Sequence, residues 1–100
     1  IHLYIDYPEK ELEKRIVCLK IPGIEKRLVD KMVNAINNIR NLDLKKRPCI
    51  SETLDWAQAL MVLQINDLSP EVLSETISVI CKYQADANLV KNSMDRIFNN

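Results

Sequence analysis

The segment "CISETLDWAQALMVL", residues 49–63, contains three polar side chains that could carry chemistry: Ser51, Glu52 and Asp55. A serine becomes a nucleophile when a nearby base accepts its proton, and the only histidine, His2, lies at the far end of the sequence. We therefore interpret Ser51 as the N-cap of the following helix. Glu52 and Asp55 are three residues apart, so we expect them to share its first turn, where the helix dipole favours carboxylates. We assign no catalytic residue.

A second candidate site is the run of cations Lys45, Lys46 and Arg47 in the segment "DLKKRPC". Three adjacent cations can bind phosphate groups, and the same pattern is also typical of an exposed loop. Spacing alone leaves both interpretations open. The chain has a single glycine, which excludes a glycine-rich phosphate-binding loop.

The three cysteines, Cys18, Cys49 and Cys81, are about 31 residues apart and form no C-x-x-C pair. A metal site normally needs three or four closely placed donors, and the chain offers only one histidine to join them. We therefore expect no metal site, and we expect these cysteines to be reduced and buried.

Composition places the chain among ordinary globular proteins, with 47% hydrophobic and 28% charged residues over a length of 100. Fourteen basic and fourteen acidic residues give no net charge, so we expect no nucleic-acid partner. No apolar run reaches the roughly 20 residues of a membrane span, and no leader resembles a signal peptide. The sequence predicts a cytoplasmic protein of one domain.

Apolar residues recur at helical spacing along most of the chain, which predicts an all-α fold, a small bundle of four to five helices. The first helix begins near Pro8, and its inward stripe is expected to be Leu12, Ile16 and Leu19. The second and longest helix runs from Glu25 to about Leu42. Its expected core residues are Leu28, Val29, Met32, Val33, Ile36 and Ile39.

Three more helices complete the expected bundle. One spans about residues 52–63, with Trp56 packed into the core beside Leu60 and Leu63. The next begins with an N-cap at Ser69 and a proline at residue 70. A last helix is expected after it, with the apolar residues Leu89 or Val90, Met94 and Ile97.

The first residues, "IHLYI", alternate apolar and polar side chains like a short strand, and no second strand follows to pair with it. A lone strand leaves its backbone groups unpaired. We therefore expect an orphan N-terminal strand over residues 1–6, the remnant of a sheet in a longer protein, followed by a helical domain over residues 7–100.

Two segments, "YIDYPEKELE" and "NLDLKKRPCISETLDWAQAL", resemble the C-terminal part of MoxR-type AAA+ ATPases, especially the CoxD-like branch associated with maturation of carbon monoxide dehydrogenase. The resemblance covers about residues 1–82. It implies that residues 1–6 are the last strand of a missing AAA+ core and that residues 7–100 are the helical lid. ATP and Mg²⁺ would then be cofactors of the parent protein and not of this chain, which alone is expected to be inactive.

The resemblance also implies partners and site residues. The partners would be the missing core, neighbouring subunits of a ring and a von Willebrand A-type domain protein. In related lids an arginine at the start of the third helix meets the terminal phosphate, and the matching residue here is Glu52, whose carboxylate would repel it. The residues expected near nucleotide are therefore Lys45, Lys46, Arg47, Ser51 and Glu52. The alternative is a freestanding helical module for protein–protein interaction.

Overall fold

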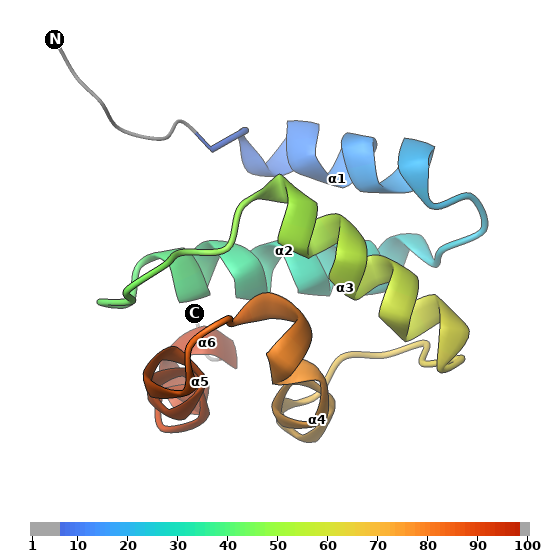
Figure 1. Ribbon diagram of the computed structural model, residues 1–100. Coiled ribbons are helices and arrows are strands. Elements are labelled where there is room, and N and C mark those ends of the chain that lie inside the picture. Colours follow the sequence, from blue (N-terminus) through green and yellow to red (C-terminus); the bar gives the residue numbers. More distant parts are fainter. Residues whose placement is uncertain (1–6, 99–100) are drawn as a thin grey trace, which may run out of the picture.

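A computed structural model of the protein describes residues 7–98, and this part of the chain is helical, with no strand (Figure 1). The predicted all-α class is confirmed for these residues. The expected strand over residues 1–6, and the boundary that follows it, lie outside the described residues. The helices are α1 (Lys10–Lys20), α2 (Lys26–Arg40), α3 (Ile50–Val62), α4 (Pro70–Ile80), α5 (Gln84–Lys91) and α6 (Met94–Phe98).

Helix α2 lies at the centre of the bundle and packs against α1, α3 and α6 (Figure 1). Helix α1 crosses the outside of α2 and α3, while α4 packs on α3 and α5 on α4. The central position of α2 follows from its sequence, because its six predicted core residues are all buried. The prediction for this helix is confirmed.

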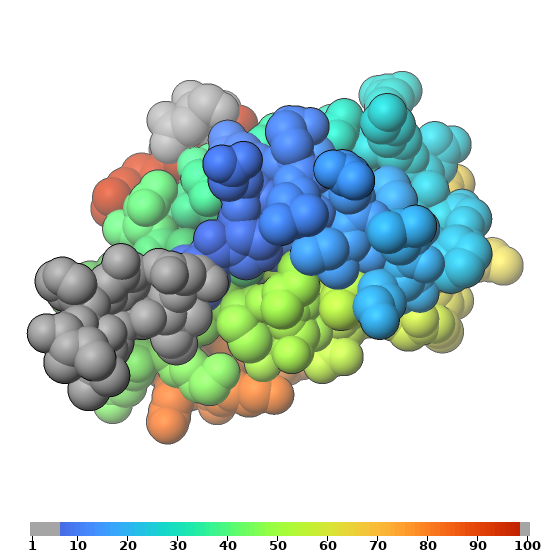
Figure 2. All heavy atoms as spheres, turned by 90° about the horizontal axis from the view of Figure 1, so that it is seen from above, coloured from blue at the N-terminus to red at the C-terminus, as the bar shows by residue number. Residues whose placement is uncertain are grey.

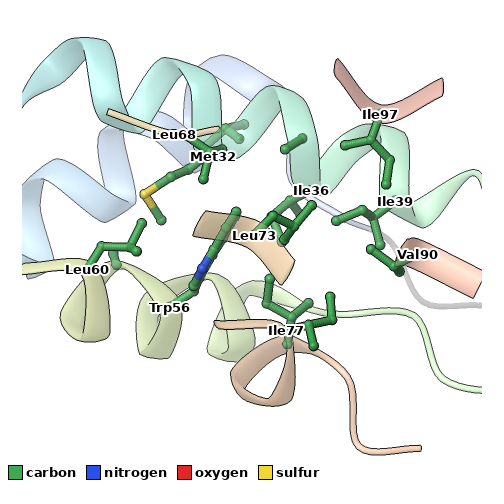
Figure 3. Packing of buried hydrophobic residues seen from close by; sticks show 14 of the residues in the cluster. Met32, Ile36, Ile39, Trp56, Leu60, Leu68, Leu73, Ile77, Val90 and Ile97 are labelled. Carbon is green, nitrogen blue, oxygen red and sulfur yellow. The ribbon is translucent and has the colours of Figure 1, made fainter. Parts of the chain in front are cut away.

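Trp56 lies in the middle of the core, where its side chain is fully buried (Figure 3). Its indole Nε1 donates a hydrogen bond of 2.8 Å to the hydroxyl of Thr76 on α4, and that hydroxyl donates to the carbonyl of Val72 at 2.7 Å. Leu60 is buried beside it, whereas Leu63 is 57% exposed. The core prediction is correct for Trp56 and Leu60 and wrong for Leu63, which lies just beyond the end of α3.

Helix α4 begins as predicted, because the hydroxyl of Ser69 accepts a hydrogen bond of 3.2 Å from the N–H of Val72 and Pro70 is the first helical residue. The predicted last helix is two helices, α5 and α6. They are separated at Asn92 and Ser93, and the hydroxyl of Ser93 donates to the carbonyl of Leu89 at 2.7 Å. The described residues therefore form six helices and not four to five.

Helix α1 is turned differently from the prediction. Leu12 and Leu19 are 46% and 79% exposed, whereas Glu13 and Val17 are almost completely buried. The expected inward stripe of Leu12, Ile16 and Leu19 is therefore wrong. The reason is the carboxylate of Glu13, which has a charged partner inside the bundle.

Candidate functional site

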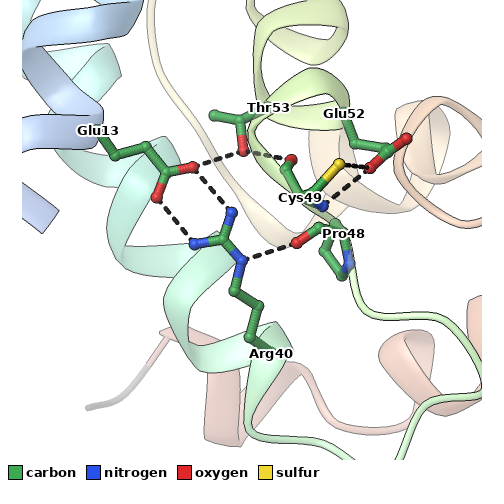
Figure 4. A network of polar contacts seen from close by, with 6 residues as sticks. All are labelled: Glu13, Arg40, Pro48, Cys49, Glu52 and Thr53. Atoms are coloured by element: carbon green, nitrogen blue, oxygen red, sulfur yellow. Dashed lines mark hydrogen bonds and ion pairs between the residues drawn. The ribbon is translucent and has the colours of Figure 1, made fainter. Parts of the chain in front are cut away.

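A buried polar network joins α1, α2 and α3 around the side chain of Arg40 (Figure 4). Its guanidinium donates to both carboxylate oxygens of Glu13, from Nη1 to Oε1 at 2.8 Å and from Nη2 to Oε2 at 2.9 Å. Its Nε donates to the carbonyl of Pro48 at 2.7 Å, and the hydroxyl of Thr53 donates to Glu13 Oε2 at 2.8 Å. The guanidinium carbon also lies 4.3 Å from the ring centroid of Tyr7.

This network is a structural junction. A two-bond pair between arginine and carboxylate is among the stronger hydrogen-bonded contacts in proteins, and both side chains here are at most about 5% exposed. Among the described residues no buried side-chain nitrogen or oxygen lacks a hydrogen-bond partner. Since removal of one partner would leave the other charged and buried, the network fixes how α1 sits on α2 and α3.

The loop before α3 contains Lys45, Lys46 and Arg47, and we call it the cationic loop. A residue from a distant part of the chain holds its backbone in place. The carboxylate of Asp86, in the first turn of α5, accepts hydrogen bonds from the backbone N–H of Lys45 at 2.9 Å and of Lys46 at 3.1 Å. Asp86 is only 2% exposed. The backbone of the loop is therefore fixed, while its side chains remain on the surface.

Each cation of the loop has a contact within the protein. Arg47 Nε donates to the carbonyl of Arg40 at 2.7 Å, at the last residue of α2. Lys46 Nζ lies 3.8 Å from Glu52 Oε2, and Lys45 Nζ lies 5.8 Å from the centroid of the Tyr83 ring. The structure thus places the three predicted cations in one exposed loop, next to the first turn of α3.

The start of α3 differs from the prediction. Its N-cap is Cys49, and the Glu52 Oε1 atom accepts hydrogen bonds from the Cys49 N–H at 2.8 Å and from its thiol at 2.9 Å (Figure 4). Ser51 is exposed inside the first turn, so its assignment as the N-cap is wrong. Glu52 accepts the hydrogen bond of the Cys49 amide, as a residue in this position does in a capping box. The helix therefore begins at Ile50, two residues earlier than a cap at Ser51 would allow.

The two carboxylates of this turn also differ from each other. Glu52 is 7% exposed and Asp55 is open to solvent, so they do not act as a pair. Burial raises the pKa of Glu52, but the hydrogen bonds from Cys49 and the charges of Lys46 and Lys82 outweigh it and hold the pKa below its ordinary value. Glu52 therefore carries its charge at neutral pH and stabilises the helix start.

The cysteines are free, and they differ in exposure. Cys18 is exposed and Cys49 is partly buried, so the expectation of three buried cysteines is wrong for Cys18. Burial, with a smaller effect of the Asp86 charge, raises the pKa of Cys81 to about 11, so its thiol is neutral and unreactive at pH 7. Over residues 7–98, no cluster of three or more His, Cys, Asp or Glu side chains could hold a metal ion.

Two surface hollows lie away from the cationic loop. A groove of about 660 Å³ runs between α1 and α2, and a hollow of about 540 Å³ lies at the junction of α4 and α5. Neither hollow is lined by Lys45, Lys46 or Arg47.

Three buried charged residues that hold this region together were not expected from the sequence: Glu13, Arg40 and Asp86. A signal for Arg40 was present, because it lies four residues after Ile36 and so extends the apolar stripe of α2 with a charge. A charged residue on a buried stripe needs a partner, but the sequence does not say which carboxylate supplies it. Asp86 gives no such signal, since acidic residues are common in the first turn of a helix.

None of the described helices is long and apolar enough to cross a membrane. Searches of protein-family models, of curated proteins and of solved structures found no significant match to this chain.

Proposed function

We propose that this chain is the helical lid of a MoxR-type AAA+ ATPase, which closes over ATP and couples its hydrolysis to neighbouring subunits. The support is one observation. The segment that carries the resemblance, "NLDLKKRPCISETLDWAQAL", folds into a fixed loop and the start of α3, and Asp86 holds its backbone from α5. A loop whose amides are fixed can hold cations in place for a phosphate at little additional entropic cost.

In this proposal Lys45 and Lys46 are the residues that face the nucleotide. Their ammonium groups are exposed, and the distance of 3.8 Å between Lys46 Nζ and Glu52 Oε2 describes a loose pair that a phosphate could replace. Arg47 has a structural role, because its Nε donates a hydrogen bond to the carbonyl of Arg40. Glu52 caps α3, but its charged carboxylate lies 3.8 Å from Lys46 Nζ, so a phosphate bound by Lys46 would have to displace this contact against the repulsion of Glu52.

The rest of the active site would belong to the parent protein. The core would bind ATP and Mg²⁺ and would position the attacking water, since none of the phosphate-binding motifs occurs in this chain. By resemblance, the parent would work in the cytoplasm as a ring, with a von Willebrand A-type domain protein as a partner in the maturation of a metal centre.

The test uses the complete reading frame that contains this chain. The expected result is a protein that hydrolyses ATP, with kcat/KM lowered at least about tenfold in a Lys45→Glu/Lys46→Glu variant. A Lys20→Glu/Lys26→Glu variant is the matched control, because both lysines are exposed and flank the turn between α1 and α2, at the opposite end of α2 from the loop. A full-length protein that binds no ATP, or equal kinetics in both variants, would contradict the proposal.

A second candidate is a freestanding helical interaction module, and one observation favours it. Leu12, Leu19, Val62 and Leu63 are large apolar residues that are 46–79% exposed. Exposed apolar residues can mark a contact surface where they form one continuous patch. A reading frame without an ATPase core, in a protein that still folds, would favour this candidate.

A further inference from the structure

The side chain of Arg40 joins two distant segments of the chain. Its Nη atoms donate to the carboxylate of Glu13, and its Nε donates to the carbonyl of Pro48 at 2.7 Å. Its guanidinium carbon also lies 4.3 Å from the centroid of the Tyr7 ring. Tyr7 and Glu13 belong to "YIDYPEKELE" and Pro48 belongs to "NLDLKKRPCISETLDWAQAL", so the two segments singled out in the sequence meet at one residue.

Arg40 holds the cationic loop near the end that leads into α3. Its side chain binds the carbonyl of Pro48, and its own backbone carbonyl accepts the hydrogen bond of Arg47 Nε at 2.7 Å. Both bonds connect the last residue of α2 to the last residues of the loop. The backbone of the loop therefore has two anchors, Asp86 at the amides of Lys45 and Lys46 and Arg40 at Pro48.

The guanidinium is itself held from the start of α1. Glu13 is buried inside the bundle, whereas Tyr7 is partly buried and lies just before α1 begins. Figure 2 shows α1, in blue, on the surface of the molecule beside α3, in yellow-green. An aromatic ring over a guanidinium attracts the charge and keeps water from that side of it. Of these two contacts, the one with Tyr7 can break without loss of the helix.

We propose that Tyr7 is a positioning residue for the cationic loop and that it acts through Arg40. When the ring leaves the guanidinium, water reaches the ion pair, and the hydrogen bonds of Arg40 to Glu13 and Pro48 weaken. The end of the loop at Pro48 then opens more often. A movement of the chain at Tyr7 thereby changes how firmly the cations of the loop are held.

Only the use of this link in an ATPase rests on the proposed function. In the proposed lid the chain before Tyr7 leads to the AAA+ core, so a movement between core and lid would reach the phosphate-binding cations through Arg40. The link itself can be measured without nucleotide. Failure of the link and failure of the ATPase proposal are therefore separate results.

The experiment is hydrogen exchange measured by NMR on the full 100-residue chain, for the parent, Tyr7→Ala and Tyr7→Phe. Three groups report on the loop: the Nε–H of Arg40 and the amides of Lys46 and Cys49. We expect Tyr7→Ala to accelerate exchange at all three by about two- to fivefold, because the guanidinium loses its ring. Tyr7→Phe should exchange like the parent, because it keeps the ring.

Two controls separate this link from general stability. Tyr83→Ala removes a ring that is 50% exposed and lies 5.8 Å from Lys45 Nζ, and it should leave exchange at the Arg40 Nε–H unchanged. Amides within α4, which contributes no residue to the network, report on the whole fold. Unchanged exchange at the three groups in Tyr7→Ala would overturn the proposal. So would faster exchange in Tyr7→Phe, or an equal acceleration within α4, which would make Tyr7 a residue that stabilises the whole bundle.

Discussion

The two faces of α1 contrast with each other. The inner face buries a glutamate at 1% exposure, and the outer face leaves Leu19 at 79%. Hydrophobicity alone would predict the reverse arrangement. The difference shows that the position of a complementary partner, and not only the apolar stripe, decides which face of a surface helix is buried.

Rough magnitudes explain this result. Burial of the two leucines would favour the opposite orientation by about 1.5–3 kcal/mol each at most. Against this, separation of Glu13 from Arg40 would leave a buried charge unpaired at a cost of about 3–5 kcal/mol. The same rotation would expose Val17, which is fully buried now, so the observed orientation is favoured.

The largest expected loss of stability is at the inner face of α1, where Glu13 lies. Glu13→Leu should lower the free energy of unfolding by about 3–5 kcal/mol, because Arg40 would stay buried without its carboxylate. Urea unfolding measures the change. The matched control is Glu11→Leu, whose side chain is 83% exposed and which should change stability by less than about 0.5 kcal/mol.

A double variant separates charge from packing at this junction. Glu13→Leu/Arg40→Met should recover most of the loss caused by Glu13→Leu alone, since it removes both charges and keeps apolar volume. If the double variant loses as much free energy of unfolding as the two single variants together, the two side chains are not energetically coupled.

The next effect concerns the cationic loop. Asp86→Ala should cost about 1–3 kcal/mol, because the N–H groups of Lys45 and Lys46 lose their acceptor. Hydrogen exchange at these two amides should accelerate more than at amides in α2. Unchanged exchange at both amides would mean that Asp86 does not hold the loop.

A smaller, pH-dependent effect is expected at the start of α3. The folded pKa of Glu52 lies below its ordinary value of 4.5, so its stabilising effect is present above that pH and is lost as the pH falls through the folded pKa. Glu52→Gln should therefore cost on the order of 1 kcal/mol at pH 7 and less at an acidic pH well below 4.5.

Thermal unfolding at both pH values measures this difference. Asp55→Asn is the control, because its carboxyl is exposed in the same turn. An equal cost of Glu52→Gln at both pH values would show that the Glu52 charge does not stabilise the cap.

The smallest effect on folding is expected at the outer face of α1. Leu12→Ser and Leu19→Ser should each change stability by less than about 0.5 kcal/mol, since these side chains gain little from the fold. Chemical unfolding at low protein concentration makes the measurement on the monomer. A loss above about 2 kcal/mol would place these leucines in the core.

The sequence predicted the parts of the fold that depend on local signals. The stripe of α2, the cap at Ser69 and the burial of Trp56 all follow from spacing or from a known capping residue, and the structure has each of them. The face that α1 buries depends instead on a contact between distant residues. Glu13 and Arg40 are 27 positions apart, and their pairing has no local signal.

The candidate site was predictable to a similar extent. The sequence brought attention to the Lys45–Arg47 run, and the structure adds the carboxylate that fixes its backbone, 40 residues further along the chain. The role of these cations with nucleotide remains a proposal. The capping role of Glu52 could have been inferred from its position three residues after Cys49, but cysteine is an uncommon N-cap and Ser51 is the stronger local signal.

The orientation of α1 is the central claim, and thiol labelling tests it most directly. In a Cys18→Ser background, single cysteines would replace Leu12, Val17 or Leu19, and their reaction rates with a thiol reagent would be compared with unfolded protein. We predict nearly unhindered reaction at residues 12 and 19, and reaction at least about 100-fold slower at residue 17, which must wait for local opening. Fast reaction at residue 17 with protection at 12 and 19 would contradict the account.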